Sequence, residues 1–545
     1  MDTINVQRKE IEKIYGKVSP FELKDKLIEL AECGRKKSTH TLLNAGRGNP
    51  NWTASTPREA FFTFGLFAVS ETKRTWNVND LAGMPGKTGI ADRLRVFIKE
   101  SRTLPGTELV EKILEYGISE LELEPDVWVY ELADGIIGDN YPIPDRMLMN
   151  VERAVKNYLS TELYKNNQGS DSFDLFAVEG ATAAMCYIFD SLKANELLSP
   201  GDRIAVMTPI FTPYLEVPHL PRYNFKVLDI NANEITRDGT HTWQYPDSEL
   251  FKLKDPQVKA LFVVNPSNPP SVAMRPESLE LLSDIVDKYN KNLMIISDDV
   301  YGTFTEGFRS IASVLPRNTI SVYSFSKYFG VTGWRLGTIA LNKDNIFDRL
   351  IRSMPDGKTA LLKKRYAALS PNPEEISFID RIVADSRQVA LKHTAGLSTP
   401  QQVQMAFFAV FDMFDKDKAY KKLTLDICHK RQKILFESLG LELRKDPYDA
   451  AYYTEFDLLE WALHNYGTEF SKYLQTNYKL VDILLKLAGE SSIVLLNGGG
   501  FRGPEWSVRI SLANLNDEAY SEIGKHLHKV LEDYVSEWNN LLVHS

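Results

Sequence analysis

The chain has 545 residues, of which 43% are hydrophobic and 25% are charged, and its formal charge is −9 at pH 7. This composition is ordinary for a globular protein that buries a sizeable core. Both signs of charge are scattered along the sequence, and the basic field that a nucleic acid requires is missing, so we expect no nucleic-acid partner.

The three cysteines, Cys33, Cys186 and Cys428, are widely spaced and lie in no CxxC pair or histidine-rich segment. This pattern argues against a disulfide framework or a zinc site, so we expect no metal and a reducing, cytoplasmic location. The charged N-terminus lacks the apolar core of a signal peptide. No window of about 18 uninterrupted apolar residues is present, so we expect no membrane span and no membrane partner.

The first part of the chain, from residue 1 to about 130, is predicted to be mostly helical, with a turn-rich break at GRGNPNWTASTP (residues 46–57). From about residue 150, helices alternate with short apolar runs. Helices are predicted over VERAVKNYLSTELY and ATAAMCYIFDSLKANELL, and strands over FDLFAVEG, RIAVMTP, FKVLDI, ALFVVNP, LMIISDD and TISVYSFS. Nearly continuous apolar strands between helices predict an α/β fold with a mixed, mostly parallel sheet covered on both faces. Such sheets bind ligands at the carboxyl ends of their strands.

A charged helical stretch is predicted from about residue 345 to 395, followed by long helices and by the strand-like pieces YYTEFDLL and EWSVRISLAN. The C-terminal part is therefore predicted to be an α+β unit, and the N-terminal segment is its expected partner. We predict three ranges: an N-terminal arm with part of a small domain and an insertion (1–135), a large domain with a helical insertion near 345–395 (136–395), and the rest of the small domain (396–545).

The segment SFSKYFGVTGWRLG (residues 324–337) follows the strand-like run 319–323, so Lys327 is predicted to lie at a strand end, in a cleft. A lysine is useful there because its amine condenses with an aldehyde and later carries a proton. The hydroxyls of Ser324 and Ser326 and the cation of Arg335 suit a phosphate dianion. For any single lysine, a solvated position in a glycine-rich loop is the alternative.

This arrangement resembles the SxxKxxxxxxxR signature of the class I aminotransferases and their relatives. The resemblance implies the fold type I architecture of pyridoxal 5′-phosphate enzymes, with a large cofactor-binding domain and a smaller α+β domain. It also implies that pyridoxal 5′-phosphate is the cofactor and that Lys327 carries it and acts as the catalytic base.

Two further segments carry the resemblance. The run Asp298-Asp299-Val300-Tyr301 follows the strand LMIIS, and Asn265 ends the strand ALFVV. A carboxylate beside a pyridinium nitrogen keeps that nitrogen protonated. The resemblance therefore puts Asp298 on the ring nitrogen and Tyr301 and Asn265 on the ring 3-oxygen. Where the family usually continues Pro-Thr-Gly, this chain has Pro269-Pro270-Ser271, so the loop beyond Asn265 departs from the pattern. In isolation each segment is an ordinary loop start.

A third further segment, between a predicted strand and a helix, carries the resemblance, which assigns the backbone of Gly180 and Ala181 and the hydroxyl of Thr182 to the cofactor phosphate. Free N–H groups at a helix start bind phosphate well, although a plain helix N-cap is the alternative. The family also places an aromatic ring against the cofactor face. Phe211 aligns best with that ring, and Tyr214 competes with it.

The resemblance gives one site residue to a neighbouring subunit. Tyr141, in GDNYP, lies where the family supplies a tyrosine across a dimer interface to the phosphate, with simple packing as the alternative. The family therefore implies a homodimer or a higher homo-oligomer.

Two arginines are the expected contacts of the substrate. Arg509, in WSVRIS, matches the family arginine that holds the substrate α-carboxylate, and its planar fork on a strand suits a rigid, bidentate grip. The loop of Arg47 and Gly48 resembles the family loop that closes over the substrate. Most relatives have an aliphatic residue at position 47, so a cation there suggests a second carboxylate, as in aspartate. The alternatives are an arginine on an exposed strand face and a surface arginine in a loop.

Compared with plain aminotransferases the chain has extra material at about 55–135 and 345–395. This length, together with AGRGNPNW, GDNYPIPDRML and SFSKYFGVTGWRLG, resembles the aspartate 4-decarboxylases. That family converts L-aspartate to L-alanine and CO₂ and retains some aspartate aminotransferase activity. A plain aspartate aminotransferase shares every motif named above, and a non-catalytic cofactor-binding regulator would keep the same cofactor contacts, although no basic helix-turn-helix module is present.

Overall fold

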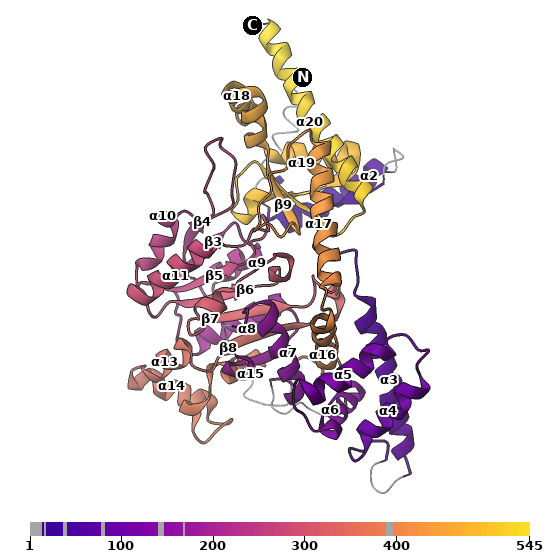
Figure 1. Cartoon of the computed structure of the whole chain (residues 1–545). Helices are drawn as coiled ribbons and strands as arrows, with labels where there is room; N and C mark the ends of the chain where they lie inside the picture. The colour runs from indigo at the N-terminus through magenta and orange to yellow at the C-terminus, as the bar shows by residue number, and fades with distance from the viewer. Residues whose placement is uncertain are drawn as a thin grey trace.

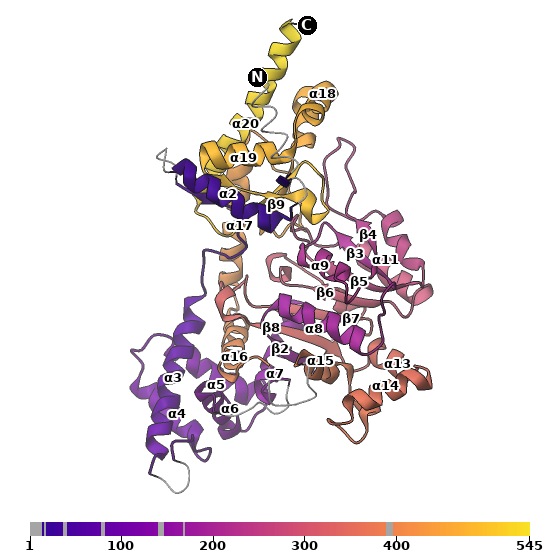
Figure 2. The same ribbon diagram turned by 180° about the vertical axis from the view of Figure 1, so that it is seen from behind.

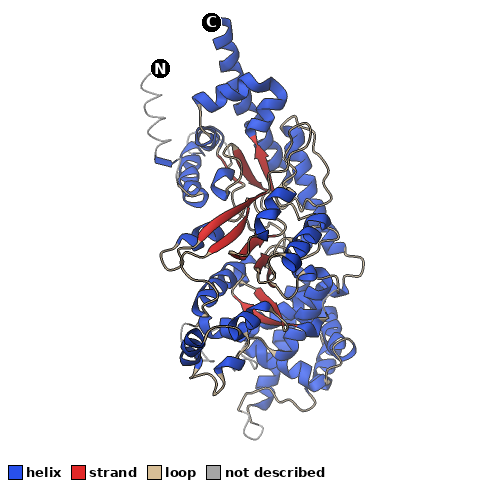
Figure 3. Cartoon of the chain, turned by 90° about the vertical axis from the view of Figure 1, so that its left-hand side faces the viewer, coloured by secondary structure: helices blue, strands red, loops and turns tan. Residues whose placement is uncertain are grey.

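The computed structural model describes residues 14–15, 18–35, 41–77, 82–139, 146–166, 169–387 and 396–544. A seven-stranded sheet and its covering helices form the middle of the molecule (Figures 1 and 2). An α+β unit, built from segments near both ends of the chain, lies at one end, and a group of helices lies at the other. Figure 3 shows the strands in the upper and middle parts of the molecule, and helices and loops at its lower end.

The central sheet is mixed and mostly parallel. Its strands in spatial order are β2 (Phe173–Val178), β8 (Gly337–Asn342), β7 (Thr319–Ser324), β6 (Met294–Asp298), β5 (Val258–Val264), β3 (Arg203–Thr208) and β4 (Lys226–Asn231). Strand β8 is antiparallel to both neighbours, and the other adjacent pairs are parallel. Every residue of β6 and β7 is buried, as expected for strands covered on both faces. The predicted α/β fold is therefore confirmed.

Helices cover both faces of this sheet. They are α7 (Met149–Glu162), α8 (Ala181–Ala194), α9 (Pro213–Glu216), α10 (Asp247–Leu250), α11 (Pro276–Lys288), α12 (Ile311–Val314), α13 (Ile346–Arg352), α14 (Asp356–Tyr366) and α15 (Phe378–Ser386). Phe189 of α8 stacks on Phe262 of β5 with ring centroids 4.3 Å apart, which fixes α8 against the sheet. The N-terminus of α8 thereby meets the edge at which the parallel strands end.

The α+β unit combines the two ends of the chain. It contains α2 (Pro20–Arg35), α17 (Ala419–Ser438), α18 (Leu458–Asn477), α19 (Leu480–Ser491) and α20 (Asp517–His544). Its antiparallel sheet has the order β11 (Leu496–Asn497), β12 (Ser507–Ser511) and β9 (Tyr453–Asp457). Strand β1 (Leu43–Asn44) pairs in parallel with β10 (Ile493–Val494), which joins the N-terminal segment to this unit. The residue boundaries of the domains stay a prediction.

The helical group consists of α3 (Ser55–Thr75), α4 (Ile90–Glu100), α5 (Thr107–Ser119) and α6 (Pro125–Ile137), which pack beside α16 (Thr399–Phe414). Trp128 of α6 is fully buried, and its indole N–H donates to the Ile113 carbonyl at 2.9 Å. A Cβ at Gly117 would lie 2.2 Å from the Trp128 ring, so α5 and α6 approach this closely only with a glycine there. Within the described ranges no helix has both the length and the apolar character needed to cross a membrane.

Candidate active site

A cavity of about 300 Å³ opens at the edge where β5, β6 and β7 end, and the α+β unit closes its other side. Eleven of the predicted site residues line it: Gly48, Ala181, Thr182, Phe211, Asp298, Tyr301, Ser324, Ser326, Lys327, Arg335 and Arg509. Segments that are far apart in the sequence therefore meet in one place. Tyr141, the predicted phosphate contact of a partner subunit, lies outside the described residues.

Lys327 lies three residues beyond the end of β7 and points to the loop of the α+β unit that carries Gly48. Its Nζ donates a hydrogen bond to the Gly48 carbonyl oxygen at 2.9 Å. A Cβ on Gly48 would lie 2.6 Å from the Tyr453 hydroxyl and 3.4 Å from the Lys327 Nζ. The loop reaches the lysine amine this closely because residue 48 has no side chain.

Asp298 is the last residue of β6, and its carboxylate is buried in the floor of the cavity. The Tyr214 hydroxyl donates to Oδ2 at 2.6 Å, and the Val300 N–H donates to Oδ1 at 3.2 Å. Burial raises the pKa of Asp298 to about 6, against the opposing effect of these two donors and of the Lys327 charge. A cation placed beside this carboxylate would therefore be strongly favoured.

The neighbouring Asp299 faces away from the cavity. It accepts hydrogen bonds from three serine hydroxyls: Ser297 at 2.6 Å, Ser310 at 2.6 Å and Ser321 at 2.7 Å. Burial raises its pKa to about 7. The two adjacent carboxyl groups thus occupy different environments, and only Asp298 of this pair lines the cavity.

Phenol and amide groups surround the region beside Asp298. The Tyr301 hydroxyl donates to the Tyr453 hydroxyl at 3.1 Å, and the Asn268 amide lies 3.4 Å from the Tyr301 hydroxyl. Asn265 accepts from the Met274 N–H at 3.0 Å through Oδ1. Its Nδ2 is buried and has no hydrogen-bond partner among the described residues. A buried amide donor without a partner is costly, so this atom fits a bound oxygen acceptor.

Donors for an anion converge at the start of α8. Gly180 has φ +87°, and a Cβ there would lie 2.5 Å from the Arg335 Nη2. Arg335 donates to the carbonyls of Thr332 (2.9 Å) and Glu179 (3.2 Å), which holds its guanidinium beside the helix N-terminus. The hydroxyls of Ser324 and Ser326 lie 2.8 Å apart on the same side of the cavity. A helix N-terminus, a cation and hydroxyl groups together suit a phosphate.

Arg509 of β12 is buried, with 1% of its surface exposed, and faces the opposite end of the cavity. Its described hydrogen-bond acceptors are neutral: Asn268 Oδ1 at 3.2 Å and the Gly46 carbonyl at 2.9 Å. The rings of Tyr453, Phe501 and Phe21 lie 4.4, 5.0 and 5.8 Å from its guanidinium carbon. Burial lowers its pKa, and its Nε has no partner in the described chain. Among the described residues this buried cation has no carboxylate in hydrogen-bonding distance, and a bound substrate would supply one.

The family model of the class I and II aminotransferases matches residues 180–527 of the sequence. The chain belongs to this family. Its relatives include the bifunctional aspartate aminotransferase and L-aspartate beta-decarboxylase of a Pseudomonas species, which is 46% identical over 526 residues, or 96% of this chain and 98% of the relative. The Pyrococcus horikoshii aspartate aminotransferase is 26% identical over 46% of this chain and 61% of its own length.

Solved structures of aminotransferases share the fold. A putative kynurenine aminotransferase of Saccharomyces cerevisiae, Bna3p, superposes with a TM-score of 0.58 at 17% identity, covering 96% of this chain and 98% of its own. A single mutant of the Thermus thermophilus aspartate aminotransferase gives a TM-score of 0.58 at 16% identity and covers 94% and 97% of the two chains. The predicted fold type I architecture is confirmed by these superpositions.

Pyridoxal 5′-phosphate, the predicted cofactor, is the cofactor of this aminotransferase family. The described residues fit it at each of its polar groups. A buried carboxylate at Asp298 suits a protonated ring nitrogen, and the unpartnered Asn265 amide suits a ring oxygen. The glycine at position 180, whose φ of +87° disfavours any larger residue, lets Arg335 lie close to the backbone and leaves room for a phosphate at the helix start.

The two candidate aromatic residues have different roles in this aminotransferase. The Tyr214 hydroxyl is committed to Asp298, as described above, and the Tyr214 side chain is buried. The Phe211 ring is half-buried, lines the cavity and meets the Phe21 ring edge-on at 5.8 Å. Phe211 thus remains the predicted ring against the cofactor face.

The cavity contains residues that the sequence did not single out, mainly Phe21, Asn268 and Tyr453. Asn268 lies in the NPSNP turn, so its polar side chain beside Asn265 was a usable signal. Phe21 and Tyr453 carry no local signal, because they are brought to Arg509 only by the assembly of the α+β unit.

Arg47 does not line the cavity, although Gly48 and Asn49 do. Its side chain is exposed, so its role in binding a second carboxylate stays a prediction. Arg502, the alternative partner of the second carboxylate should Arg47 not bind it, is ion-paired with Asp229.

Proposed function

We propose that this chain converts L-aspartate to L-alanine and CO₂ with pyridoxal 5′-phosphate as cofactor, and that it also acts as an aspartate aminotransferase. The observation that carries the proposal is the 46% identity to the bifunctional Pseudomonas enzyme over almost the whole of both chains. The helical group α3–α6 lies within that matched length, whereas the family model begins only at residue 180.

The cofactor would be held at both ends. We assign Asp298 to the ring nitrogen, and Tyr301 and Asn265 to the ring 3-oxygen. The proposed phosphate contacts are Gly180, Ala181, Thr182, Ser324, Ser326, Arg335 and, from a partner subunit, Tyr141. When bound there, the cofactor supplies a carbonyl carbon for the substrate amine and a protonated ring that withdraws electrons.

Lys327 is proposed as the base that takes the proton from the substrate Cα and returns it to another carbon. Its Nζ is held 2.9 Å from the Gly48 carbonyl oxygen, which accepts one of its hydrogens and fixes the direction of the amine. Because Gly48 belongs to the loop that closes the cavity, this contact couples the position of the base to closure of the site.

Arg509 is proposed to bind the α-carboxylate of aspartate. The guanidinium is held between a carbonyl and an amide oxygen, so its fork is already oriented for a bidentate carboxylate. Tyr453 and Phe21 cover it and exclude water from that end of the cavity. A desolvated pair of this kind fixes the substrate in one orientation.

A decarboxylase releases the β-carboxylate of aspartate as CO₂, whereas an aminotransferase retains it. Among the described residues that line the cavity, the cations are Lys327, Arg335 and Arg509. Arg335 lies at the proposed phosphate end and Arg509 is assigned to the α-carboxylate, so neither is left for the β-carboxylate. A carboxylate gripped by a buried cation is stabilised in the ground state, which opposes its departure as CO₂. The lining therefore favours decarboxylation.

The direct experiment incubates the holoenzyme with L-aspartate and quantifies alanine, CO₂ and oxaloacetate. Alanine and CO₂ in equal amounts, with a smaller yield of oxaloacetate when a 2-oxo acid is added, are expected. Oxaloacetate without CO₂ would indicate the plain aminotransferase, and the absence of all three products would indicate a non-catalytic cofactor-binding protein.

Arg47 is kept in the proposal as the partner of the β-carboxylate during binding and transamination. Arg47→Ala should then weaken aspartate far more than alanine in the transamination half-reaction, and Arg47→Lys should weaken it less. A loss of about 3–5 kcal/mol indicates a desolvated pair with the substrate, whereas about 0–1 kcal/mol indicates an exposed arginine. Equal, small effects on both amino acids would reject the assignment.

We also propose a cytoplasmic homodimer or higher homo-oligomer. Three apolar side chains on one face of α3 are exposed: Phe62 (59%), Leu66 (57%) and Val69 (43%). Phe62 contacts Trp334, the residue before Arg335, so this face runs towards the phosphate end of the site. Leu66→Asp should shift the mass in light scattering towards the monomer and weaken cofactor retention. An unchanged mass would reject this face as the subunit contact.

A further inference from the structure

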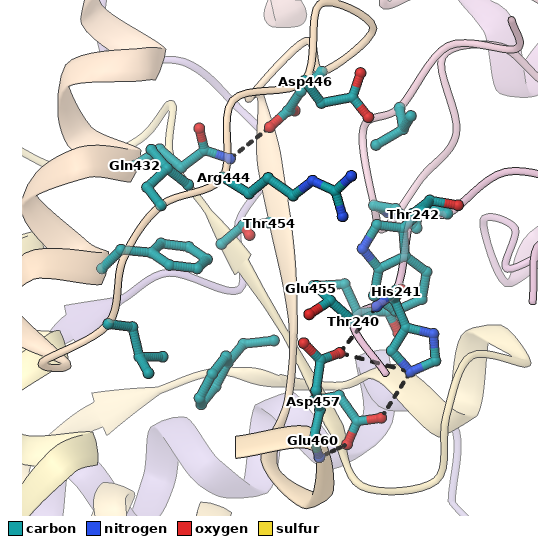
Figure 4. A pocket seen from close by; sticks show the side chains of 18 of the residues that line it. Thr240, His241, Thr242, Gln432, Arg444, Asp446, Thr454, Glu455, Asp457 and Glu460 are labelled. Carbon is teal, nitrogen blue, oxygen red and sulfur yellow. Dashed lines mark hydrogen bonds and ion pairs between the residues drawn. The ribbon is translucent and has the colours of Figure 1, made fainter. Parts of the chain in front are cut away.

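A second cavity, of about 660 Å³, lies between the central sheet unit and the α+β unit. One wall is formed by the loop around residues 240–243 and by Val272 and Arg275. The other walls come from α17, the loop 441–449, β9 and the start of α18 (Figure 4). Its volume falls in the range of small-molecule sites, about 300–1,000 Å³. None of the residues assigned to the cofactor or the substrate lines it.

Three lysine or arginine side chains line this cavity: Arg275, Arg444 and Lys445. The Arg444 side chain extends across the space towards the wall of Thr242 and His241 (Figure 4). Among the described residues no hydrogen bond or ion pair is found for its guanidinium. By contrast, Arg275 of the same lining is ion-paired with Glu234 at 2.8 Å. Lys445 likewise has no hydrogen bond or ion pair within the described chain, so Arg444 and Lys445 are the cations available to an anionic ligand. Of these two, Arg444 is the one whose side chain crosses the cavity, and it lies close enough to Asp238 of the same lining to help to lower the pKa of that carboxyl group.

A buried carboxyl group faces the same cavity. Glu455 of β9 is 5% exposed, and its Oε1 accepts a hydrogen bond from the Ser507 hydroxyl at 2.6 Å. Its Oε2 is buried and has no hydrogen-bond partner within the described chain. Burial raises the pKa of Glu455 to about 8, so the group is protonated at neutral pH and offers a donor. A cation and a carboxylic acid donor together suit a carboxylate ligand.

The remaining charges and the apolar surface narrow the class of ligand. His241 lies 3.1 Å from Asp457 and 4.0 Å from Glu460, so one histidine offsets two acidic side chains and the wall keeps negative character. A monoanion is therefore favoured over a dianion such as phosphate. The His241 ring stacks on Trp243 with centroids 4.6 Å apart, and Phe436 lies on another wall. These rings offer apolar surface to the body of the ligand.

The cavity is connected to the active site through one strand pair. In the β12–β9 ladder, Glu455 lies directly opposite Arg509, and directly opposed residues project from the same face of a sheet. A ligand that bonds Glu455 thus acts one strand away from the proposed substrate arginine. It also touches both structural units and would stabilise their arrangement relative to each other.

We propose that this cavity is an effector site for an organic monocarboxylate with an apolar body, bound between Arg444 and Glu455, and that its occupancy changes the KM for aspartate through Arg509. Binding of the monocarboxylate in this cavity does not depend on the function proposed for the active site. The effect on KM rests on the proposed role of Arg509.

The binding experiment uses the holoenzyme and 4-fluorobenzoate as the probe, with broadening of its fluorine NMR signal as the readout. Arg444→Ala should weaken binding by about fivefold or more. Arg237→Ala is the matched control, because Arg237 is an exposed cation close in sequence to the wall of residues 240–243 but does not line the cavity, and this variant should bind the probe as the wild type does. Arg509→Ala should also retain the broadening, because that arginine lies in the other cavity.

Three results would overturn the proposal: no broadening in the wild type, equal broadening in the wild type and Arg444→Ala, or broadening that only Arg509→Ala removes. The last would place the probe in the active site. For the coupling, 4-fluorobenzoate should change the aspartate KM of the wild type and not that of Arg444→Ala. An equal change in the aspartate KM of both enzymes would reject the coupling between the cavity and Arg509. Arg444→Ala should form the same products from aspartate as the wild type, because this variant leaves the active-site lining intact. A failure of the effector proposal is therefore distinguishable from a failure of the proposed function.

Discussion

Replacing Asp298 by asparagine tests the electrostatic core of the site. Asp298→Asn keeps the shape of the side chain and still accepts the Tyr214 hydrogen bond, but it removes the charge. Burial raises the pKa of Asp298 from 3.8 to about 6, which corresponds to about 3 kcal/mol against the charged form. If the protonated ring of the cofactor offsets this cost, the variant should lose about 3 kcal/mol of stabilisation, or about 100-fold in kcat.

The assay is the rate of alanine formation from aspartate, expressed per bound cofactor. Asp299→Asn is the matched control, because it makes the same change at a buried carboxyl group that faces three serines instead of the cavity. Its kcat per bound cofactor should stay within about twofold of the wild type. A wild-type rate in Asp298→Asn, or the same loss in both variants, would refute the assignment of Asp298.

The pH dependence of stability gives a second test of the same residue. Because the pKa of Asp298 is raised in the folded chain, its contribution to stability is fully present below about pH 3.8 and is lost as the pH rises through about 6. At pH 7 the cofactor-free Asp298→Asn variant should therefore be more stable to urea than the cofactor-free wild type, by up to about 3 kcal/mol. If the variant were less stable than the wild type, burial of the charged carboxylate would not lower the free energy of unfolding.

Three further predictions follow from the same geometry. Lys327→Ala should abolish the near-visible absorbance of the bound cofactor and nearly all turnover, and a wild-type rate would remove Lys327 as the base. Gly48→Ala should lower kcat/KM at least about tenfold, because a Cβ would lie 2.6 Å from the Tyr453 hydroxyl; unchanged kinetics would mean that the loop is free to shift. Lys421→Met should cost about 2 kcal/mol in urea unfolding, because buried Glu162 keeps only one of two lysine partners. Burial alone would raise the pKa of Glu162, but the lysines lower it to about 2, so this contribution is present above about pH 4.5 and is lost as the pH falls towards 2.

Much of the central sheet could be predicted because its strands are buried on both faces and read as continuous apolar runs. The run ALFVVNP corresponds to β5 and LMIISDD to β6, and Val264 of β5 and Asp298 of β6 line the cavity. Strand β8 was not predicted. It follows directly after the loop of Lys327 and Arg335 and runs antiparallel between β2 and β7, where the alternation of strand and helix is interrupted.

The extra N-terminal material shows the opposite case. Helicity was predicted for it, but periodicity does not say against which surface a helix packs. The segment divides at the turn-rich loop: α2 and β1 pack with the α+β unit, whereas α3–α6 pack beside α16. Contacts of this kind join residues hundreds of positions apart, and no local pattern encodes them.

The chemical groups of the site could be recognised from local sequence. A lysine after a strand, a carboxylate at a strand end and a glycine at a helix start have meaning locally, because strand ends and helix starts expose donors and acceptors in known directions. How these groups combine depends on the folding of distant segments against one another, which the tertiary structure shows. It separated Asp298 from Asp299, since burial and hydrogen bonding are properties of the assembled environment. It also enclosed Arg509 in aromatic rings and left Arg47 exposed, because the desolvation of a cation depends on side chains contributed from distant parts of the chain.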